Sequence, residues 1–233
     1  MSAASAHIEL HALADGDALA VALAQRVADD LRAALAARGR ASLALSGGST
    51  PKRFLQALSR QALAWPKVAV TLVDERWVGE DSDRSNAALL RSHLLRNEAA
   101  TADFVPLYRA AADVEQALAE VEAALSPLLP LDVAVLGMGA DGHTASFFPG
   151  GDRLAEALDP DATAIVLPMR APGAGEPRIT LTLPVLRAAR RLYLHIEGAQ
   201  KRAVLERALD GDDLPMAAVL QQAADAFPVY WCP

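Results

Sequence analysis

Two titratable side chains, Asp141 and His143, stand two residues apart in a glycine-rich segment. A mostly apolar segment, residues 131–136, comes directly before this segment and is predicted to be a buried strand. Glycines at positions 137, 139 and 142 let the backbone approach a ligand and take up positive φ. A histidine beside a carboxylate can exchange a proton near neutral pH. The segment therefore predicts an active site at the end of a strand in an α/β enzyme.

The same glycines match the G-x-G-x-x-G pattern of dinucleotide-binding loops. In that pattern an acidic residue closes the next strand, whereas Asp159 and Asp161 precede the strand that follows here. Asp141 would also place negative charge beside a pyrophosphate. A plain tight turn is the structural alternative, but His143 belongs to no apolar pattern that would bury it. We therefore interpret the segment as catalytic.

A second group of candidates has the composition of an anion site. Ser46-Gly47-Gly48-Ser49-Thr50 lies between a predicted strand and a predicted helix, where free amides and hydroxyls favour anions. The Gly-Lys-Ser/Thr ending of a nucleotide P-loop is missing. The alternative is simple capping, with Thr50 as the N-cap and Pro51 as the first helical residue.

Three cations are candidates for binding negative charge. Arg76 closes the Asp74-Glu75-Arg76 cluster, which is either part of a site, as its position directly after an apolar strand indicates, or a solvated charge cluster; the sequence leaves both open. Lys201 lies in the first turn of a predicted helix, where it opposes the macrodipole, and a bound phosphate would offset that cost. Snorkelling of Lys201 along the apolar helix face is the alternative. Arg178 opens a strand and is either a site cation or a surface arginine. The other histidines, which no motif surrounds, are assigned structural roles: His7, His11, His93 and His195.

The elements that must position these residues alternate between strand-like and helix-like segments. Strands are predicted over residues 7–12, 41–45, 67–73, 131–136, 164–167, 179–183, 192–196 and 227–231. Helices are predicted over residues 15–38, 51–59, 85–95, 111–125 and 198–209, the first of them between an Asp15 cap and Gly39. This alternation predicts a doubly wound α/β fold in one domain over residues 1–233, with a mostly parallel sheet and helices on both faces. Ligands collect at the carboxyl ends of such strands, where the candidates stand.

Composition limits the partners and the cofactors. The net charge of −7 disfavours nucleic acid and anionic membranes as partners, so a small molecule is expected. Cys232 is the one cysteine, which excludes an internal disulfide, and no His-x-x-x-His or Cys-x-x-Cys spacing occurs to hold zinc. We expect no metal and no cofactor. The sequence has no signal-peptide pattern and no long uncharged apolar run, which predicts a cytoplasmic protein.

Six blocks of sequence, in order, resemble those of the 6-phosphogluconolactonase family. They are Leu45–Pro51, Asp74–Val78, Ser85-Asn86, Gly137–Ser146, Arg178–Thr182 and Gly198–Lys201. The resemblance implies a sugar-phosphate isomerase/deaminase-like fold. It also implies hydrolysis of 6-phospho-D-glucono-1,5-lactone to 6-phosphogluconate in the oxidative pentose phosphate pathway. The usual lactonase ending, a tryptophan followed shortly by an aspartate, is replaced here by Trp231-Cys232-Pro233.

Two alternatives to a lactonase remain. Glucosamine-6-phosphate deaminases share several blocks, but they carry Asp-Glu-Tyr where this chain has Asp74-Glu75-Arg76. They also carry an acidic residue five positions past the histidine, where this chain has Phe148. A non-catalytic sugar-phosphate-binding domain would need an attached module, and the first 40 residues offer only a strand and one long helix. The lactonase interpretation is therefore favoured, as a monomer or a weak homo-oligomer.

Each candidate has a role in lactone hydrolysis. We expect His143 to act as the general base that activates water. We expect Asp141 to orient the imidazole ring of His143 or to stabilise the imidazolium. Arg76, Arg178 and Lys201 would supply positive charge for the phosphate or the carbonyl oxygen, and the sequence does not divide these tasks among them. The rest of the substrate site is expected to come from Ser46, Gly47, Gly48, Ser49, Thr50 and Asp74.

Overall fold

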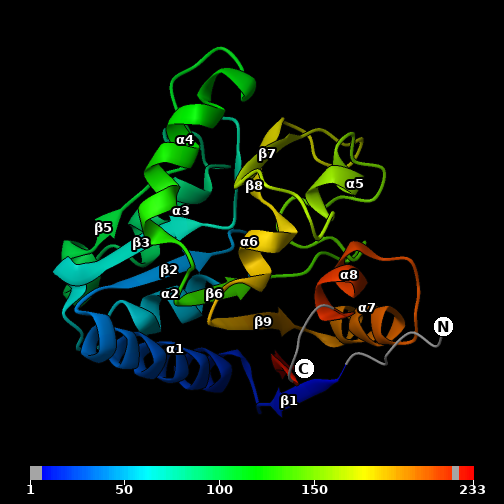
Figure 1. Cartoon of the computed structure of the whole chain (residues 1–233). Coiled ribbons are helices and arrows are strands. Elements are labelled where there is room, and N and C mark those ends of the chain that lie inside the picture. The colour runs from blue at the N-terminus through cyan, green and yellow to red at the C-terminus, as the bar shows by residue number, and fades with distance from the viewer. Residues whose placement is uncertain (1–6, 222–225) are drawn as a thin grey trace.

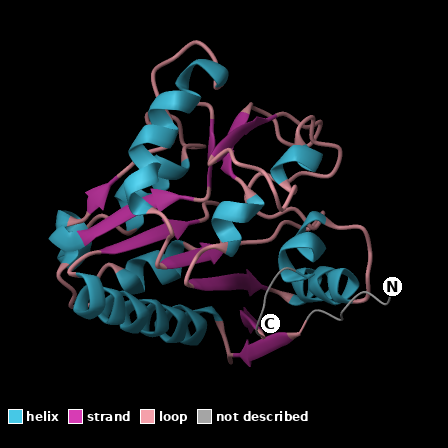
Figure 2. Cartoon of the chain, in the orientation of Figure 1, coloured by secondary structure: helices cyan, strands magenta, loops and turns pink. Residues whose placement is uncertain are grey.

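A seven-stranded parallel sheet runs through the middle of the protein (Figures 1 and 2). Its spatial order is β1 (Ile8–Ala12), β10 (Phe227–Cys232), β9 (Arg191–Glu197), β6 (Val133–Leu136), β2 (Ala41–Leu45), β3 (Val68–Leu72) and β5 (Asp103–Phe104). The structure is a computed structural model that describes residues 7–221 and 226–233. Every residue of the central strands β2 and β6 is buried, which explains their continuous apolar sequence.

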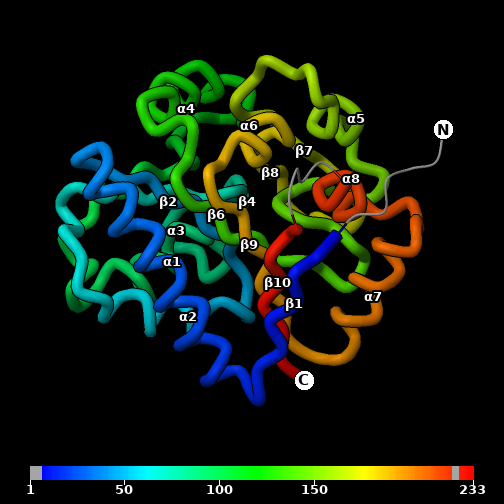
Figure 3. Tube along the Cα trace, turned by 60° about the horizontal axis from the view of Figure 1, so that its bottom comes forward, coloured from blue at the N-terminus to red at the C-terminus, as the bar shows by residue number. Residues whose placement is uncertain are grey.

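Helices cover both faces of this sheet, as the alternating pattern predicts (Figures 1 and 3). They are α1 (Gly16–Arg38), α2 (Lys52–Leu58), α3 (Asn86–His93), α4 (Leu118–Leu125), α5 (Leu154–Ala157), α6 (Leu183–Arg187), α7 (Ala199–Leu209) and α8 (Pro215–Gln221). Helix α1 packs on β2, β6 and β10, with α2 beside it, while α4 and α6 lie across the sheet from α1. None of the helices in the described part of the chain has the length and apolarity needed to cross a membrane.

Helix α1 has the ends that its sequence predicts. The Asp15 carboxylate accepts hydrogen bonds from the backbone N–H groups of Asp17 (3.0 Å) and Ala18 (2.8 Å). Gly39 ends the helix with a φ of +71°. The apolar stripe of α1 is buried from Leu19 to Leu31 and partly buried at Leu35, so cap and stripe together fix the helix.

A second sheet, which the sequence did not predict, stands beside the carboxyl ends of the main strands. It contains β4 (Asp74–Arg76), β8 (Arg178–Leu181) and β7 (Val166–Met169), all antiparallel. Residues 164–167 and 179–183 were expected to be strands of the main sheet, and residues 74–76 a loop. A short loop without a helix joins β7 to β8, so the two strands form a hairpin and cannot be parallel neighbours. Pairing of β4 with β8 places Arg76 opposite Arg178.

The helices also differ in part from the prediction. The helix predicted over residues 111–125 is shorter, because α4 begins only at Leu118 after a 3₁₀ turn, Glu115–Ala117. Helices α5, α6 and α8 were not predicted. They have only 4, 5 and 7 residues, so their apolar residues carry no clear helical period.

Candidate active site

One pocket at the carboxyl ends of the parallel strands collects almost all the predicted site residues. Its lining includes Ser46 to Thr50, Asp74, Arg76, His143, Arg178 and Lys201. The pocket encloses about 860 Å³ of empty space, its open mouth included. The imidazole of His143 and the ammonium group of Lys201 therefore belong to the same site, although they are far apart in the sequence. Asp141 does not line the pocket and contacts it only through His143.

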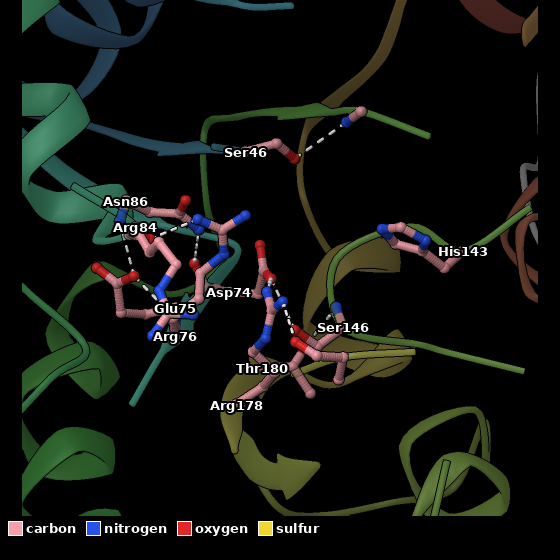
Figure 4. A network of polar contacts seen from close by, with 12 residues as sticks. Ser46, Asp74, Glu75, Arg76, Arg84, Asn86, His143, Ser146, Arg178 and Thr180 are labelled. Atoms are coloured by element: carbon pink, nitrogen blue, oxygen red, sulfur yellow. Dashed lines mark hydrogen bonds and ion pairs between the residues drawn. The ribbon is translucent and has the colours of Figure 1, made fainter. Parts of the chain in front are cut away.

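The histidine is held by its aspartate neighbour. Nδ1 of His143 lies 2.5 Å from Oδ1 of Asp141, and the same oxygen accepts the backbone N–H of His143 at 3.2 Å. Burial raises the pKa of Asp141, but the charge and hydrogen bonds of His143 outweigh this effect, and the net pKa is lowered. With Nδ1 paired, Nε2 is the ring nitrogen left to act in the pocket (Figure 4). Gly139 allows this packing, since a Cβ there would lie 2.3 Å from the imidazole.

A buried ion pair lies beneath the pocket where the two sheets meet (Figure 4). Nη1 of Arg178 is 3.8 Å from Oδ2 of Asp74, and both residues are more than nine-tenths buried. The hydroxyl of Ser146 donates to the same oxygen at 2.7 Å, and Nη2 of Arg178 donates to the carbonyl of Ala174 at 2.7 Å. Burial lowers the pKa of Arg178, while Asp74 opposes this shift. Arg178 is thus a buried cation in the pocket lining, and the surface alternative is wrong.

Glu75 and Asn86 are structural residues of the site that sequence reasoning missed. The Glu75 carboxylate is fully buried and accepts the backbone N–H groups of Arg76 (2.8 Å), Asn86 (2.7 Å) and Ala87 (2.7 Å). The Asn86 side chain donates to the carbonyl of Asp74 at 2.9 Å and fills the space that a side chain at Gly47 would need. The carboxylate therefore joins β4 to the start of α3. The sequence signal that could have pointed to the start of α3 is Ser85, which caps this helix.

Replacing Glu75 with glutamine is expected to lower the free energy of unfolding by about 2 to 4 kcal/mol. The glutamine amide would turn its NH₂ group toward the backbone N–H groups that the carboxylate now accepts. Some of these buried N–H donors would then have no acceptor. Urea unfolding followed by circular dichroism measures the loss. Glu80→Gln is the matched control, because Glu80 pairs with Arg91 near the surface and its replacement should cost less than about 1 kcal/mol. Equal losses for both variants would contradict the structural role of Glu75.

The glycine loop contacts the lysine side of the pocket. The hydroxyl of Thr50 accepts a hydrogen bond from Nζ of Lys201 at 3.1 Å. The predicted capping role of Thr50 is wrong, because Pro51 is the N-cap of α2 and no side chain caps that helix. Burial lowers the pKa of Lys201, and Glu197 opposes this shift. The ammonium group therefore meets Thr50 at the pocket wall.

Strand β10 supports the turn that carries Lys201. The indole N–H of Trp231 donates to the carbonyl of Gly198 at 3.1 Å, and the N–H of Gly198 donates to the carbonyl of Cys232 at 2.9 Å. Gly198 has a φ of +90° and precedes the first residue of α7. The unusual ending of this sequence thus has a structural role next to the site.

His195 was assigned a structural role and is indeed buried, but it also lines the pocket. Its Nε2 lies 3.2 Å from a carboxylate oxygen of Glu197, and its ring packs edge-on against Phe54. Its position in an apolar strand gave no sequence signal for a site. Among residues 7–221 and 226–233, no group of three or more histidine, cysteine or acidic side chains is arranged to hold a metal ion.

This fold is that of a known class. The chain matches the family described as glucosamine-6-phosphate isomerases/6-phosphogluconolactonase over residues 14–230, and it belongs to that family. Among its relatives is the 6-phosphogluconolactonase of Rhizobium meliloti (strain 1021), which is 54% identical over 228 residues, or 96% of this chain and 98% of the relative. The 6-phosphogluconolactonase of Pseudomonas putida is 44% identical over 98% of this chain and 94% of its own length.

Solved structures give the same result for the fold. A 6-phosphogluconolactonase from Shewanella baltica OS155 superposes with a TM-score of 0.91 at 39% identity, covering 98% of this chain and 99% of that one. A monomeric glucosamine-6-phosphate deaminase superposes with a TM-score of 0.78 at 18% identity, over 97% of each chain. The latter likeness shows a shared fold alone. The predicted fold class and family are confirmed.

Proposed function

We propose that this protein hydrolyses 6-phospho-D-glucono-1,5-lactone to 6-phosphogluconate, a step of the oxidative pentose phosphate pathway. The observation that carries this proposal is the joint presence in one pocket of three cations and of His143, whose ring contacts Asp141. Its relatives named 6-phosphogluconolactonase, at 44% to 54% identity over nearly the whole chain, support the same activity. A δ-lactone needs an activated water, and a sugar phosphate needs positive charge; the pocket offers both.

The chemistry follows from the positions of these groups. Nε2 of His143 takes a proton from a water molecule as the water oxygen attacks the lactone carbonyl carbon. The Asp141 carboxylate holds Nδ1–H and stabilises the imidazolium that forms. The bond between the carbonyl carbon and the ring oxygen then breaks, and His143 returns the proton to the departing oxygen. The product is the open-chain acid.

The cations serve the two negative groups of the reaction. Lys201, together with Thr50 and the amides of the glycine loop, binds the phosphate, because a helix start and an ammonium group meet there. Arg76 and Arg178 supply the remaining positive charge, for the phosphate and for the carbonyl oxygen as it becomes negative.

The direct test is an assay of lactone hydrolysis with the lactone generated in situ, because this lactone also opens slowly without an enzyme. Purified protein should raise the rate well above this background and should release no ammonia from glucosamine 6-phosphate. Ammonia release would favour the deaminase alternative. Tight binding of 6-phosphogluconate without turnover would favour the non-catalytic binding domain. Against the deaminase stands the buried Phe148 beside His143, at the position where deaminases carry an acidic residue.

Replacing Lys201 with alanine is expected to raise KM by about 30-fold, since removing one partner of a partly buried charge contact costs about 2 kcal/mol. The value of kcat should change much less, because the phosphate is remote from the reacting carbonyl. Lys52→Ala is the matched control. Lys52 also lies in the first turn of a helix next to the site, but it is exposed and outside the pocket lining. An unchanged KM for Lys201→Ala would remove this residue from the phosphate site.

We further propose that the protein acts in the cytoplasm as a monomer or a weak homo-oligomer, with a small-molecule substrate and no nucleic-acid or membrane partner. Its net charge of −7 supports the last two points. Sedimentation at several protein concentrations tests the oligomeric state, and a stable dimer at low concentration would contradict it.

A further inference from the structure

Phe148 lies against the base and against the buried ion pair at the same time. The ring centroids of Phe148 and His143 are 4.4 Å apart, with 35° between the ring planes. The guanidinium carbon of Arg178 is 5.2 Å from the centroid of the same phenyl ring. Phe148 is 4% exposed, so its ring is packed inside the protein. One aromatic ring thus connects the imidazole to the Asp74–Arg178 pair.

The loop that carries Phe148 is fixed by groups outside its own turn. The hydroxyl of Ser146 donates to Asp74 in β4 at 2.7 Å, and the N–H of Ser146 donates to the Thr180 hydroxyl in β8 at 3.2 Å. The carbonyl of Phe148 accepts the N–H of Gly151 at 2.9 Å. Ala145, which lines the pocket, takes a φ of +49°, a conformation that a non-glycine residue adopts only where its surroundings enforce it. Two strands of the second sheet, β4 and β8, therefore determine where the phenyl ring lies.

The imidazole needs such support because its aspartate partner is a weak anchor. Asp141 is exposed and stands two residues before His143 in the same turn. Their hydrogen bond holds Nδ1 of His143 against Asp141, but it does not anchor the two side chains to another part of the protein. Within the described chain, the aromatic ring packed against His143 is that of Phe148, in a tilted arrangement. A ring in such close contact restricts rotation of the imidazole about its side-chain bonds.

We propose that Phe148 is a positioning residue: packed against His143 and held by Arg178, it fixes the imidazole plane so that Nε2 stays directed at the water that attacks the lactone carbonyl. The proposal rests on the proposed function, in which His143 is the base. A small misplacement of a catalytic group is costly, since an error of 1 Å can lower the rate by about a hundredfold. Phe148 itself touches no reacting atom and acts only through His143.

The test compares two neighbouring phenylalanines. Phe148→Leu removes the ring that packs against His143. Phe147→Leu is the matched control, because Phe147 is fully buried but stacks on neither His143 nor Arg178 in the described structure. Phe148→Leu is expected to lower kcat by about tenfold or more with KM changed less than about threefold. Phe147→Leu should lose similar thermal stability and keep kcat within about twofold. Phe148→Tyr keeps the ring and should restore most of kcat.

A second measurement follows the imidazole without turnover. In protein labelled with ¹³C at its histidines, the His143 ring signals are expected to be displaced by the phenyl ring current. This displacement should vanish in Phe148→Leu and remain in Phe147→Leu and Phe148→Tyr. Equal loss of kcat in both leucine variants, or an unchanged His143 signal in Phe148→Leu, would overturn the proposal. If Phe148→Leu does not fold, Phe148→Met, of similar volume, carries the same expectations.

The two proposals fail in different ways. Wild-type protein without lactonase activity contradicts the proposed function, whereas the nuclear magnetic resonance signal still reports the stacking. Wild-type activity together with full kcat in Phe148→Leu contradicts only the positioning role.

Discussion

Replacing His143 with alanine is expected to lower kcat for lactone hydrolysis by about 10²- to 10⁴-fold, the contribution of a general base. The variant keeps every cation of the pocket, so the affinity for 6-phosphogluconate should change little. Stopped-flow assays with freshly generated lactone measure kcat, and isothermal titration calorimetry measures product binding. Together they separate a loss of chemistry from a loss of the site.

His93→Ala is the matched control for this variant. His93 is also a histidine with a hydrogen-bonded ring, since its Nδ1 lies 3.0 Å from the Gln56 amide, but it is absent from the pocket lining. Its replacement should leave kcat unchanged. Full activity in His143→Ala would remove this residue from the mechanism. Loss of product binding equal to the loss of kcat would instead assign His143 a binding role.

Replacing Arg178 with methionine is expected to lower the free energy of unfolding by about 3 to 5 kcal/mol. The methionine fills a similar volume but leaves the buried carboxylate of Asp74 with only the Ser146 hydroxyl. Urea unfolding measures the change. Arg170→Met is the control, because the Arg170–Glu115 pair, 2.8 Å apart, is nearly half exposed on both sides and should contribute no more than about 1 kcal/mol.

The double variant Arg178→Met with Asp74→Asn distinguishes charge from packing. Removing the carboxylate charge should restore part of the lost stability, because the remaining amide carries no unpaired charge. If Arg178→Met costs no more than Arg170→Met, the pair beneath the pocket does not stabilise the junction of the two sheets.

The long first helix and the strands of the main sheet other than β5 could be predicted because their signals are local. Helix α1 has an aspartate cap, a periodic apolar stripe and a glycine stop within its own sequence. Strand β4 has no such signal. Asp74, Glu75 and Arg76 are all charged, so the segment lacks the alternation of apolar and polar residues that predicts a strand. They form a strand only because β8, about one hundred residues later, pairs with them. Pairing over such a separation leaves no trace in a local pattern.

The residues of the site also divide into those that the local sequence predicts and those that it does not. Residues placed directly after apolar strands, such as Asp74 and His143, could be predicted from that position. Glu75 and Phe148 could not, because their roles depend on partners elsewhere in the fold. Thr50 shows the opposite error. Its position before a proline is a good local capping signal, but its hydroxyl contacts Lys201 from a helix 150 residues away.

The position of β10 has a consequence for how the protein is made. Strand β10 lies between β1 and β9, with Ile8 opposite Phe227, so β1 pairs with residues that the ribosome adds more than two hundred positions later (Figure 3). During synthesis β1 therefore has no partner strand until β10 has been made, whereas the central strands can pair earlier. Because Trp231 and Cys232 also hold the turn before Lys201, a nascent chain that lacks them has lost two hydrogen bonds of this turn. The pocket wall around Lys201 is thus completed only after residues 231 and 232 have been added.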